Sequence, residues 1–271
     1  MTIEGLNMEG MDAGILLPAF VAGLVVLLTH IPLGREVIHR GIIFIDLAIA
    51  QIAGLGVIIA FQFGGEMHGL EAQGAAICSA LLGAWLIHFL EKRASEHLEA
   101  MIGICFVLAA SASVLLLAHN PHGSEHIKEL LVGQILWVDW QQIIPAAIVS
   151  AIVVLVWFKF KHKIGKIGFY VLFAIAITTS VQLIGVYLVF SSLIIPALAA
   201  AKLEKSKPGM AGLSATGAMI IAAIIGVSGY SLGLIVSALF DLPSGAVIVW
   251  SLLISALIIP VLVSKSIKVE S

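Results

Sequence analysis

Charged residues are scarce in this sequence. Asp, Glu, Lys and Arg make up 11% of the 271 residues and hydrophobic residues make up 61%, against about 25% and about 45–50% in soluble domains. The composition therefore predicts an all-α, polytopic membrane protein. It leaves almost no room for a soluble domain, and we expect residues 1–271 to form a single transmembrane domain.

Several motifs are also missing. No G-x-x-x-x-G-K-[ST] run occurs, so the chain by itself lacks the usual phosphate cradle for ATP. H-E-x-x-H does not occur, and the G-x-S-x-G match at 229–233 lies inside a long apolar segment, which gives little support to a membrane protease or another enzyme. The basic runs are short and lie next to apolar segments, which gives no support to nucleic-acid binding. The two cysteines, Cys78 and Cys105, lie inside apolar segments, which favours small core residues over a disulfide or a soft-metal site.

Long apolar segments fill most of the chain. A helix needs about 20 apolar residues to cross a bilayer core of about 30 Å. Candidate spans lie at residues 12–33, 42–62, 70–90, 98–118, 137–159, 211–236 and 245–264, and residues 167–201 provide two short passes or one long broken helix. We therefore expect eight or nine transmembrane helices. No basic residue precedes the first span, so we expect that helix to be retained rather than cleaved as a signal peptide.

Lysine and arginine placement predicts the sidedness of these spans, because cytoplasmic loops are enriched in these residues. The basic residues gather at Arg35 and Arg40, at Lys92 and Arg93, at 159–166, at 201–209 and at 264–268. Counting crossings between them places the N-terminus outside and the C-terminus inside. This assignment needs two crossings between the basic runs at 159–166 and 201–209, which favours nine spans.

A carboxylate and an amide lie inside the second span. Asp46 and Gln51 interrupt the run "RGIIFIDLAIAQIAGLG" at 40–56. A carboxylate in a span costs about 2.5–3.5 kcal/mol on insertion scales unless it meets water or a partner. We therefore predict that Asp46 faces a translocation pathway, the alternative being a structural pair with Arg35 or Arg40. Gln51 lies about 140° round the helix from Asp46 and either lines the same route or makes an interhelical hydrogen bond.

A second polar cluster precedes Gly185 in the long 167–201 stretch. It consists of Thr178, Thr179, Ser180 and Gln182. We interpret it as the place where this stretch breaks, because carbonyls freed at a helix break can coordinate a cation if they line a protein cavity. The cluster is the second candidate for the translocation pathway.

Histidines gather in a segment assigned to the outer side. "HNPHGSEH" contains His119, His122, Glu125 and His126, with two imidazoles at i, i+4 spacing. Neutral imidazole suits zinc and carboxylate suits manganese. The segment is therefore a candidate for metal capture, the alternative being a loop whose histidines are simply solvated.

Three stretches resemble the membrane permease of ABC-type zinc and manganese uptake systems, the ABC-3 family. They are "PLGREVIHRGIIFIDLAIAQIAGLG" at 32–56, similar to the family's first loop and second helix, "GVYLVFSSLIIPALAA" at 185–200, and "SALFDLPSGAVIVW" at 237–250. The resemblance implies a homodimeric permease in a bacterial or archaeal inner membrane. It also implies two cytoplasmic ATPase subunits, an extracytoplasmic metal-binding protein as donor, and no cofactor besides the transported divalent cation.

The sequence departs from the family pattern at two places. The family usually has Asp-Ala-x-x-His in the second helix, and its Asp and His positions fall here on Leu47 and Gln51, with the carboxylate displaced to Asp46. The basic run at 159–166 is also shorter than the segment that these permeases usually present to the ATPase. The ATPase is therefore expected to bind either this short run or residues 201–209. The leading hypothesis is the permease of an ABC metal importer. A stand-alone secondary transporter or channel for a cation is the alternative.

Overall fold

The computed structural model describes residues 13–64, 69–93, 95–118, 120, 123–133, 135–161, 163–204 and 214–269. Within these ranges the chain is all-α, and nine of its helices are long and apolar enough to cross a membrane. This confirms the predicted class and the preference for nine spans. The bounds are α1 Ala13–Arg40, α2 Ile45–Gln62, α3 Leu70–Arg93, α4 Leu98–Leu117, α5 Gly123–Val132, α6 Trp140–Phe160, α7 Lys166–Ile184, α8 Val186–Glu204, α9 Ala215–Phe240 and α10 Ser244–Val269.

Two stretches expected to be loops contain helix. Residues 32–40, which resemble the family's first loop, form the last turns of α1, and Pro32 does not interrupt the helix. The basic residues in the last turn stabilise this helix, because a positive charge interacts favourably with the negative end of the helix dipole. Part of the histidine segment "HNPHGSEH" belongs to the short helix α5. Its sequence "GSEHIKELLV" places apolar residues at i, i+3 and i+4 from Ile127, so that one face is apolar.

The long stretch 167–201 divides into two helices at Gly185. This glycine has φ 77° and ψ 163° and ends α7, while α8 begins at the next residue. Such a backbone conformation is open to glycine and strained for other residues. The predicted break is therefore confirmed, three residues after Gln182.

The segment "DLPSG" at 241–245 forms the turn between α9 and α10. Asp241 ends α9 in the left-handed region with φ 52°, and α10 begins at Ser244. The Ser237 hydroxyl donates to the Leu242 carbonyl at 2.7 Å and holds the two ends of the turn together.

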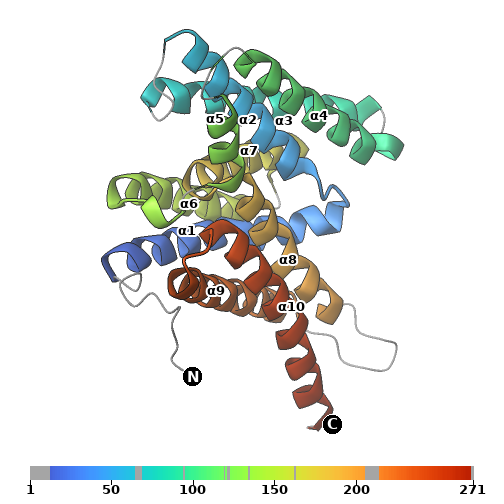
Figure 1. Cartoon of the computed structure of the whole chain (residues 1–271). Helices are drawn as coiled ribbons and strands as arrows, with labels where there is room; N and C mark the ends of the chain where they lie inside the picture. The colour runs from blue at the N-terminus through green and yellow to red at the C-terminus, as the bar shows by residue number, and fades with distance from the viewer. Residues whose placement is uncertain are drawn as a thin grey trace.

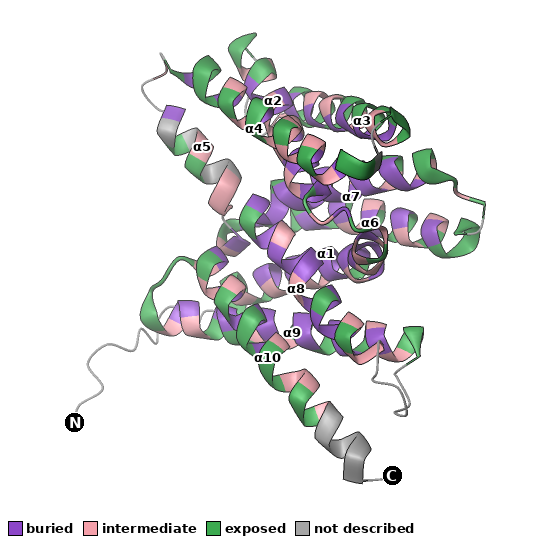
Figure 2. Cartoon of the chain, turned by 90° about the vertical axis from the view of Figure 1, so that its right-hand side faces the viewer, coloured by how far each residue is buried: buried purple, intermediate pink, exposed green. Residues whose placement is uncertain are grey.

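Helices α1, α7 and α8 form the centre of the bundle (Figure 1). In the most apolar stretches of α7 and α8, 61% of the residues are buried, whereas only 22% are buried in the corresponding stretches of α4 and α10. Figure 2 shows the same contrast, with buried residues concentrated on the central helices and exposed ones on the outer helices. The outer faces of α4 and α10 are apolar and exposed, as expected for faces in contact with lipid.

The helix ends gather on two opposite faces, as the predicted sidedness requires. On the predicted outer face, Gln62 at the end of α2 donates from Nε2 to the Leu116 carbonyl near the end of α4 at 2.8 Å. On the predicted inner face, Arg35 of α1 binds Glu204 at the end of α8 with an Nη2–Oε1 distance of 2.6 Å. There too, Lys166 of α7 binds Glu91 of α3 at 2.7 Å. Ends predicted to share a side of the membrane therefore lie together.

Candidate functional site: a cavity between two groups of helices

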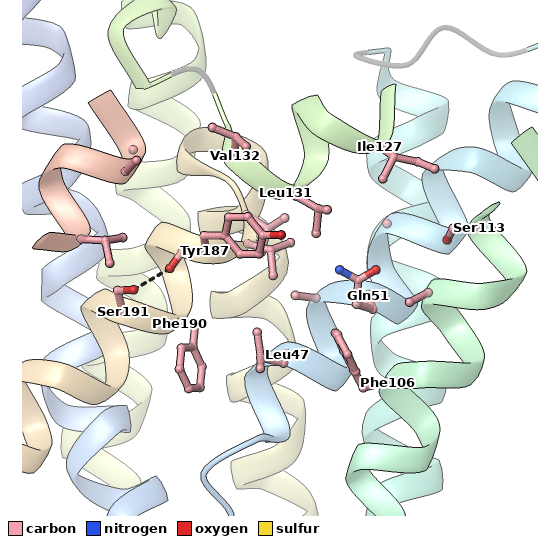
Figure 3. Close-up of a pocket in the computed structure, with 18 of the residues that line it drawn as sticks. Leu47, Gln51, Phe106, Ser113, Ile127, Leu131, Val132, Tyr187, Phe190 and Ser191 are labelled. Atoms are coloured by element: carbon pink, nitrogen blue, oxygen red, sulfur yellow. Dashed lines mark hydrogen bonds between the residues drawn. The ribbon is translucent and has the colours of Figure 1, made fainter. Parts of the chain in front are cut away.

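A cavity of about 690 Å³ lies between α2 and α4 on one side and α8 and α10 on the other. Figure 3 shows Leu47 and Gln51 of α2 and Phe106 of α4 lining it opposite Tyr187, Phe190 and Ser191 of α8. Trp250 and Val249 of α10 complete the second side. The cavity therefore lies where helices predicted to cross the membrane separate from one another.

Helix α5 closes the end of the cavity that faces the predicted outer side. Its apolar residues Ile127, Leu131 and Val132 line this end (Figure 3). The residue that follows, Gly133, contacts the break between α7 and α8, since a Cβ built on it would lie 2.6 Å from the Gly185 nitrogen. α5 is thus fixed at its C-terminal end to the beginning of α8, which itself lines the cavity.

An aromatic pair lies toward the opposite, inner end. Phe190 of α8 stacks on Phe44, which precedes α2, with ring centroids 6.4 Å apart and an interplanar angle of 4°. Phe190 also lines the cavity. The cavity is thus bounded by α5 on the outer side, and α2 and α8 meet through this pair on the inner side.

Few polar side chains face the cavity. The hydroxyl of Ser113 donates to the Ala109 carbonyl at 3.0 Å, and that of Ser191 donates to the Tyr187 carbonyl at 2.8 Å. Both serine protons are therefore used within their own helices. The Gln51 amide and the Tyr187 hydroxyl reach toward the cavity from opposite sides (Figure 3) and make no hydrogen bond to any other described residue. These two groups remain available to a ligand.

The chain belongs to the ABC 3 transport family. The family model matches residues 12–169 and 159–264, which together include all nine spanning helices except the last residues of α10. Among curated relatives, a "Probable iron transport system membrane protein" of Haemophilus influenzae is 26% identical over 221 residues, which are 74% of this chain and 76% of that protein.

Two solved structures share the fold of this ABC 3 family member. One is described as "PsaBC from Streptococcus pneumoniae in complex with Fab", with TM-score 0.72, 22% identity and coverage of 93% of this chain and 94% of that one. The other is described as an inward-facing conformation of a putative metal-chelate type ABC transporter, with TM-score 0.59, 18% identity and coverage of 92% and 85%. The chain thus shares its fold with both of these proteins.

Asp46 and Gln51 have different surroundings in this structure. Gln51 lines the cavity, whereas Asp46 is 1% exposed and is not among the lining residues. The angular separation of about 140° along a helix explains why the two side chains diverge. Neither carboxylate oxygen of Asp46 has a hydrogen-bond partner among the described residues.

The predicted alternative for Asp46, a pair with an arginine, is wrong. Arg35 binds Glu204 through two hydrogen bonds of 2.6 and 3.3 Å. Arg40 binds Glu36 at 2.9 Å, and its guanidinium carbon lies 4.1 Å from the centre of the Phe169 ring. Both arginines are therefore engaged elsewhere on the inner face. A role for Asp46 in binding the cation stays a prediction.

The polar cluster before Gly185 lies beside the cavity rather than in its wall. Thr178 and Ser180 are buried, and Gln182 is exposed. The Thr179 hydroxyl donates to the Ile175 carbonyl at 2.9 Å, within α7. Only Val181 of this segment lines the cavity. The proposed contact of these four polar residues with a cargo also stays a prediction.

The histidine segment can be followed only in part. His119 and His122 lie outside the described residues, and His126 lies in α5, where its side chain is not described. Over the part of the chain that is described, no group of three or more His, Cys, Asp or Glu residues is placed to hold a metal.

Sequence reasoning missed the aromatic lining of the cavity. Tyr187, Phe190 and Trp250 lie in stretches that were chosen for their resemblance to the family, but no residue of the second or third stretch was assigned to the pathway. The signal was present at Gly185, because residues that follow a helix break can face the space that the break opens.

Proposed function

We propose that this ABC 3 family member is the permease subunit of an importer for a divalent metal of the zinc or manganese class. It would work as a homodimer in a bacterial or archaeal inner membrane, with two ATPase subunits and an extracytoplasmic metal-binding protein. The names of its relatives support a metal cargo, since one is called an iron transport protein and another a putative metal-chelate type transporter. ATP hydrolysis would belong to the separate ATPase subunit, in line with the missing P-loop.

The path of α8 is the observation that carries this proposal. The helix begins at the break beside α5, lines the cavity with Tyr187, Phe190 and Ser191, and ends on the inner face at Glu204. A displacement applied at its inner end by an ATPase would therefore reach the cavity wall through one rigid element. We place ATPase docking at this inner end of α8 and the residues that follow it.

The α8 helix is well anchored for such a role. At the inner end, Glu204 binds Arg35, and His39 Nε2 lies 3.9 Å from the same carboxylate. Near the middle, the hydroxyls of Ser192 and Tyr230 are hydrogen-bonded at 2.8 Å, which joins α8 to α9. Motion of α8 would therefore carry parts of α1 and α9 with it, since these contacts are buried or half-buried.

Copurification and transport together test the proposal. The chain is coexpressed with a candidate P-loop ATPase from the same organism, and membrane vesicles are assayed for uptake of ⁶⁵Zn and ⁵⁴Mn with and without ATP. We expect a stable complex and uptake that requires ATP and is lost when the P-loop lysine of the ATPase is replaced. Recovery of no ATPase, or uptake driven by an ion gradient alone, would instead support the secondary transporter.

A further inference from the structure

One side of α3 carries two aromatic rings and an arginine in a continuous stack. Trp85 and Phe89 lie with their ring centroids 5.8 Å apart and an interplanar angle of 20°. The guanidinium carbon of Arg93 lies 4.4 Å from the centre of the Phe89 ring. The three residues follow one another at i, i+4 and i+8, so they are neighbours along one side of the helix and extend over about 12 Å of its length. We call these three residues the α3 ladder.

The α3 ladder faces outward from the bundle. Trp85 is 63% exposed and Phe89 is 37% exposed, and Arg93 is exposed as well. Leu82, which is 67% exposed, continues the same apolar surface away from the helix end. Because α3 ends at Arg93 on the predicted inner face, Leu82 and Trp85 lie at the depth of lipid acyl chains and Arg93 lies at the depth of the headgroups. Tryptophan is enriched near this boundary.

Arg93 differs from the other two arginines of the chain. Arg35 and Arg40 each bind a glutamate. Arg93 has no carboxylate partner among the described residues, although Glu96 is only three positions away. A planar guanidinium that lies over a ring uses its face for that contact and keeps its N–H donors in its own plane. The donors of Arg93 are therefore oriented by Phe89 and remain available to a ligand.

A phospholipid phosphate fits these donors. Arginine binds phosphate oxygens through two parallel N–H···O bonds, and Arg93 lies at the depth where such phosphates are found. Anionic lipids attract basic residues next to a membrane helix, and Lys92 places a second exposed positive charge beside Arg93. An acyl chain of the same lipid can extend along Trp85 and Leu82. One lipid therefore contacts both ends of the α3 ladder, whereas a soluble phosphate would contact only Arg93.

We propose that the α3 ladder binds one anionic phospholipid of the inner leaflet, with its phosphate on the Arg93 guanidinium and an acyl chain against Trp85 and Leu82. Such a lipid would stabilise the helix that supports the cavity, since α3 packs closely on α2. A Cβ built on Gly56 of α2 would lie 2.6 Å from the Ala75 carbonyl oxygen of α3, so the two backbones approach closely there. The inference does not depend on the cargo or on an ATPase.

Photo-crosslinking of the full-length chain tests the inference. The protein is placed in nanodiscs of phosphatidylcholine that contain a small fraction of phosphatidylglycerol with a diazirine in one acyl chain. After irradiation, mass spectrometry measures the crosslinks on α3 relative to those on α6. Unlabelled phosphatidylglycerol and soluble glycerol 3-phosphate are added separately as competitors, which distinguishes a lipid from a free phosphate.

Three variants of the α3 ladder separate charge from geometry. Arg93→Ala removes the guanidinium, Arg93→Lys keeps the positive charge without the planar fork, and Phe89→Leu removes the ring beneath it. Lys159→Ala is the matched control, because Lys159 is exposed in the last turn of α6 and its removal changes the net charge by the same amount as Arg93→Ala. Thermal unfolding in phosphatidylcholine alone checks that each variant is folded.

We expect the α3 crosslinks to fall about fivefold in Arg93→Ala, because the charged hydrogen bonds to the phosphate are lost. They should fall by a smaller factor in Arg93→Lys and Phe89→Leu and remain unchanged in Lys159→Ala. Unlabelled phosphatidylglycerol should compete, and glycerol 3-phosphate should not.

Four results would overturn the inference. Undiminished α3 crosslinks in Arg93→Ala would mean that the lipid contacts only the apolar surface, and an equal loss in Lys159→Ala would mean that net charge alone decides. Displacement by glycerol 3-phosphate would assign Arg93 to a free phosphate. Crosslinks on α6 without any on α3 in the unaltered chain would show that protein, such as a second copy, covers this side of α3.

Discussion

Gly133 and Gly185 lie with their backbones in direct contact, and both have positive φ angles, 67° and 77°. A Cβ built on Gly185 would lie 2.7 Å from the Gly133 Cα and 2.7 Å from the Val132 carbonyl carbon. The contact joins the end of α5, which closes the outer end of the cavity, to the beginning of α8, which forms one of its walls. Movement of α8 is thereby linked to the outer closure.

Gly185→Ala should disrupt this contact. The backbone conformation at φ 77° and ψ 163° is essentially restricted to glycine and costs another residue about 1–3 kcal/mol, and the added methyl group has no room beside Gly133. We expect a lower thermal unfolding temperature and strongly reduced ATP-driven uptake. Gly103→Ala is the matched control, because Gly103 lies inside α4 with no atom within 4 Å of a built Cβ. It should be neutral or stabilising, and an equal loss in both variants would contradict the argument.

Arg35 and Glu204 should be energetically coupled. Their side chains are 21% and 22% exposed and joined by two hydrogen bonds, and hydrogen bonds to charged groups contribute about 1.5–3 kcal/mol. A double-mutant cycle with Arg35→Ala and Glu204→Ala, read by thermal unfolding in detergent, should give a coupling of about 1 kcal/mol or more.

The Lys166–Glu91 pair offers a comparison for this cycle. Lys166 is 63% exposed, and exposed ion pairs contribute about 0.2–1 kcal/mol because solvent and salt screen them. Its coupling should therefore be smaller and should fall further as salt is added. Coupling that is larger at Lys166–Glu91 than at Arg35–Glu204 would show that burial does not decide the strength of these inner-face pairs.

Asp46→Asn should reduce ATP-driven metal uptake at least tenfold without loss of folded protein. The carboxylate is buried and unpartnered among the described residues, so its neutralisation removes an unfavourable charge and should leave the melting temperature equal or higher.

Glu71→Gln, an exposed carboxylate at the start of α3, is the control for this substitution and should remain active. Full activity of a well-expressed Asp46→Asn variant would exclude the predicted role of Asp46. The cation site would then have to be sought around residues 178–182.

Combined replacement of His119, His122 and His126 by alanine should weaken uptake at limiting metal and leave uptake at saturating metal unchanged. The reason is that imidazoles at the outer face would raise capture of a borderline metal rather than its passage. Uptake is measured across metal concentrations, with the complete permease and its partners. Equal uptake by the variant at the lowest concentration would mean that these histidines are only solvated.

Ser244 and Lys163 should lie on opposite sides of the membrane. Single cysteines are placed at these positions after Cys78 and Cys105 are replaced, because Cys78 is exposed in this structure. A membrane-impermeant maleimide applied to intact cells should modify the cysteine at 244 and spare that at 163, with both labelled after lysis. Equal labelling in intact cells would overturn the predicted topology.

The sequence by itself determined the membrane class, the number of spans and the alternation of helix ends between two faces. Long apolar runs and the placement of Lys and Arg are local properties, and the bilayer imposes one answer on them. The break at Gly185 was also readable, since Gly tolerates positive φ at little cost. The helical end of α1 and helix α5 were missed, because short polar stretches acquire helix through packing that local sequence does not reveal.

Only the tertiary structure decided which side chains share the cavity. Gln51, Phe106, Tyr187 and Trp250 come from four helices far apart in the sequence, and their meeting depends on how these helices cross. Arg35 likewise binds a residue 169 positions away, Glu204, rather than the nearby Asp46. A carboxylate in a span signals that a polar environment or partner is needed, but the rotation and packing of each helix determine whether the side chain meets one.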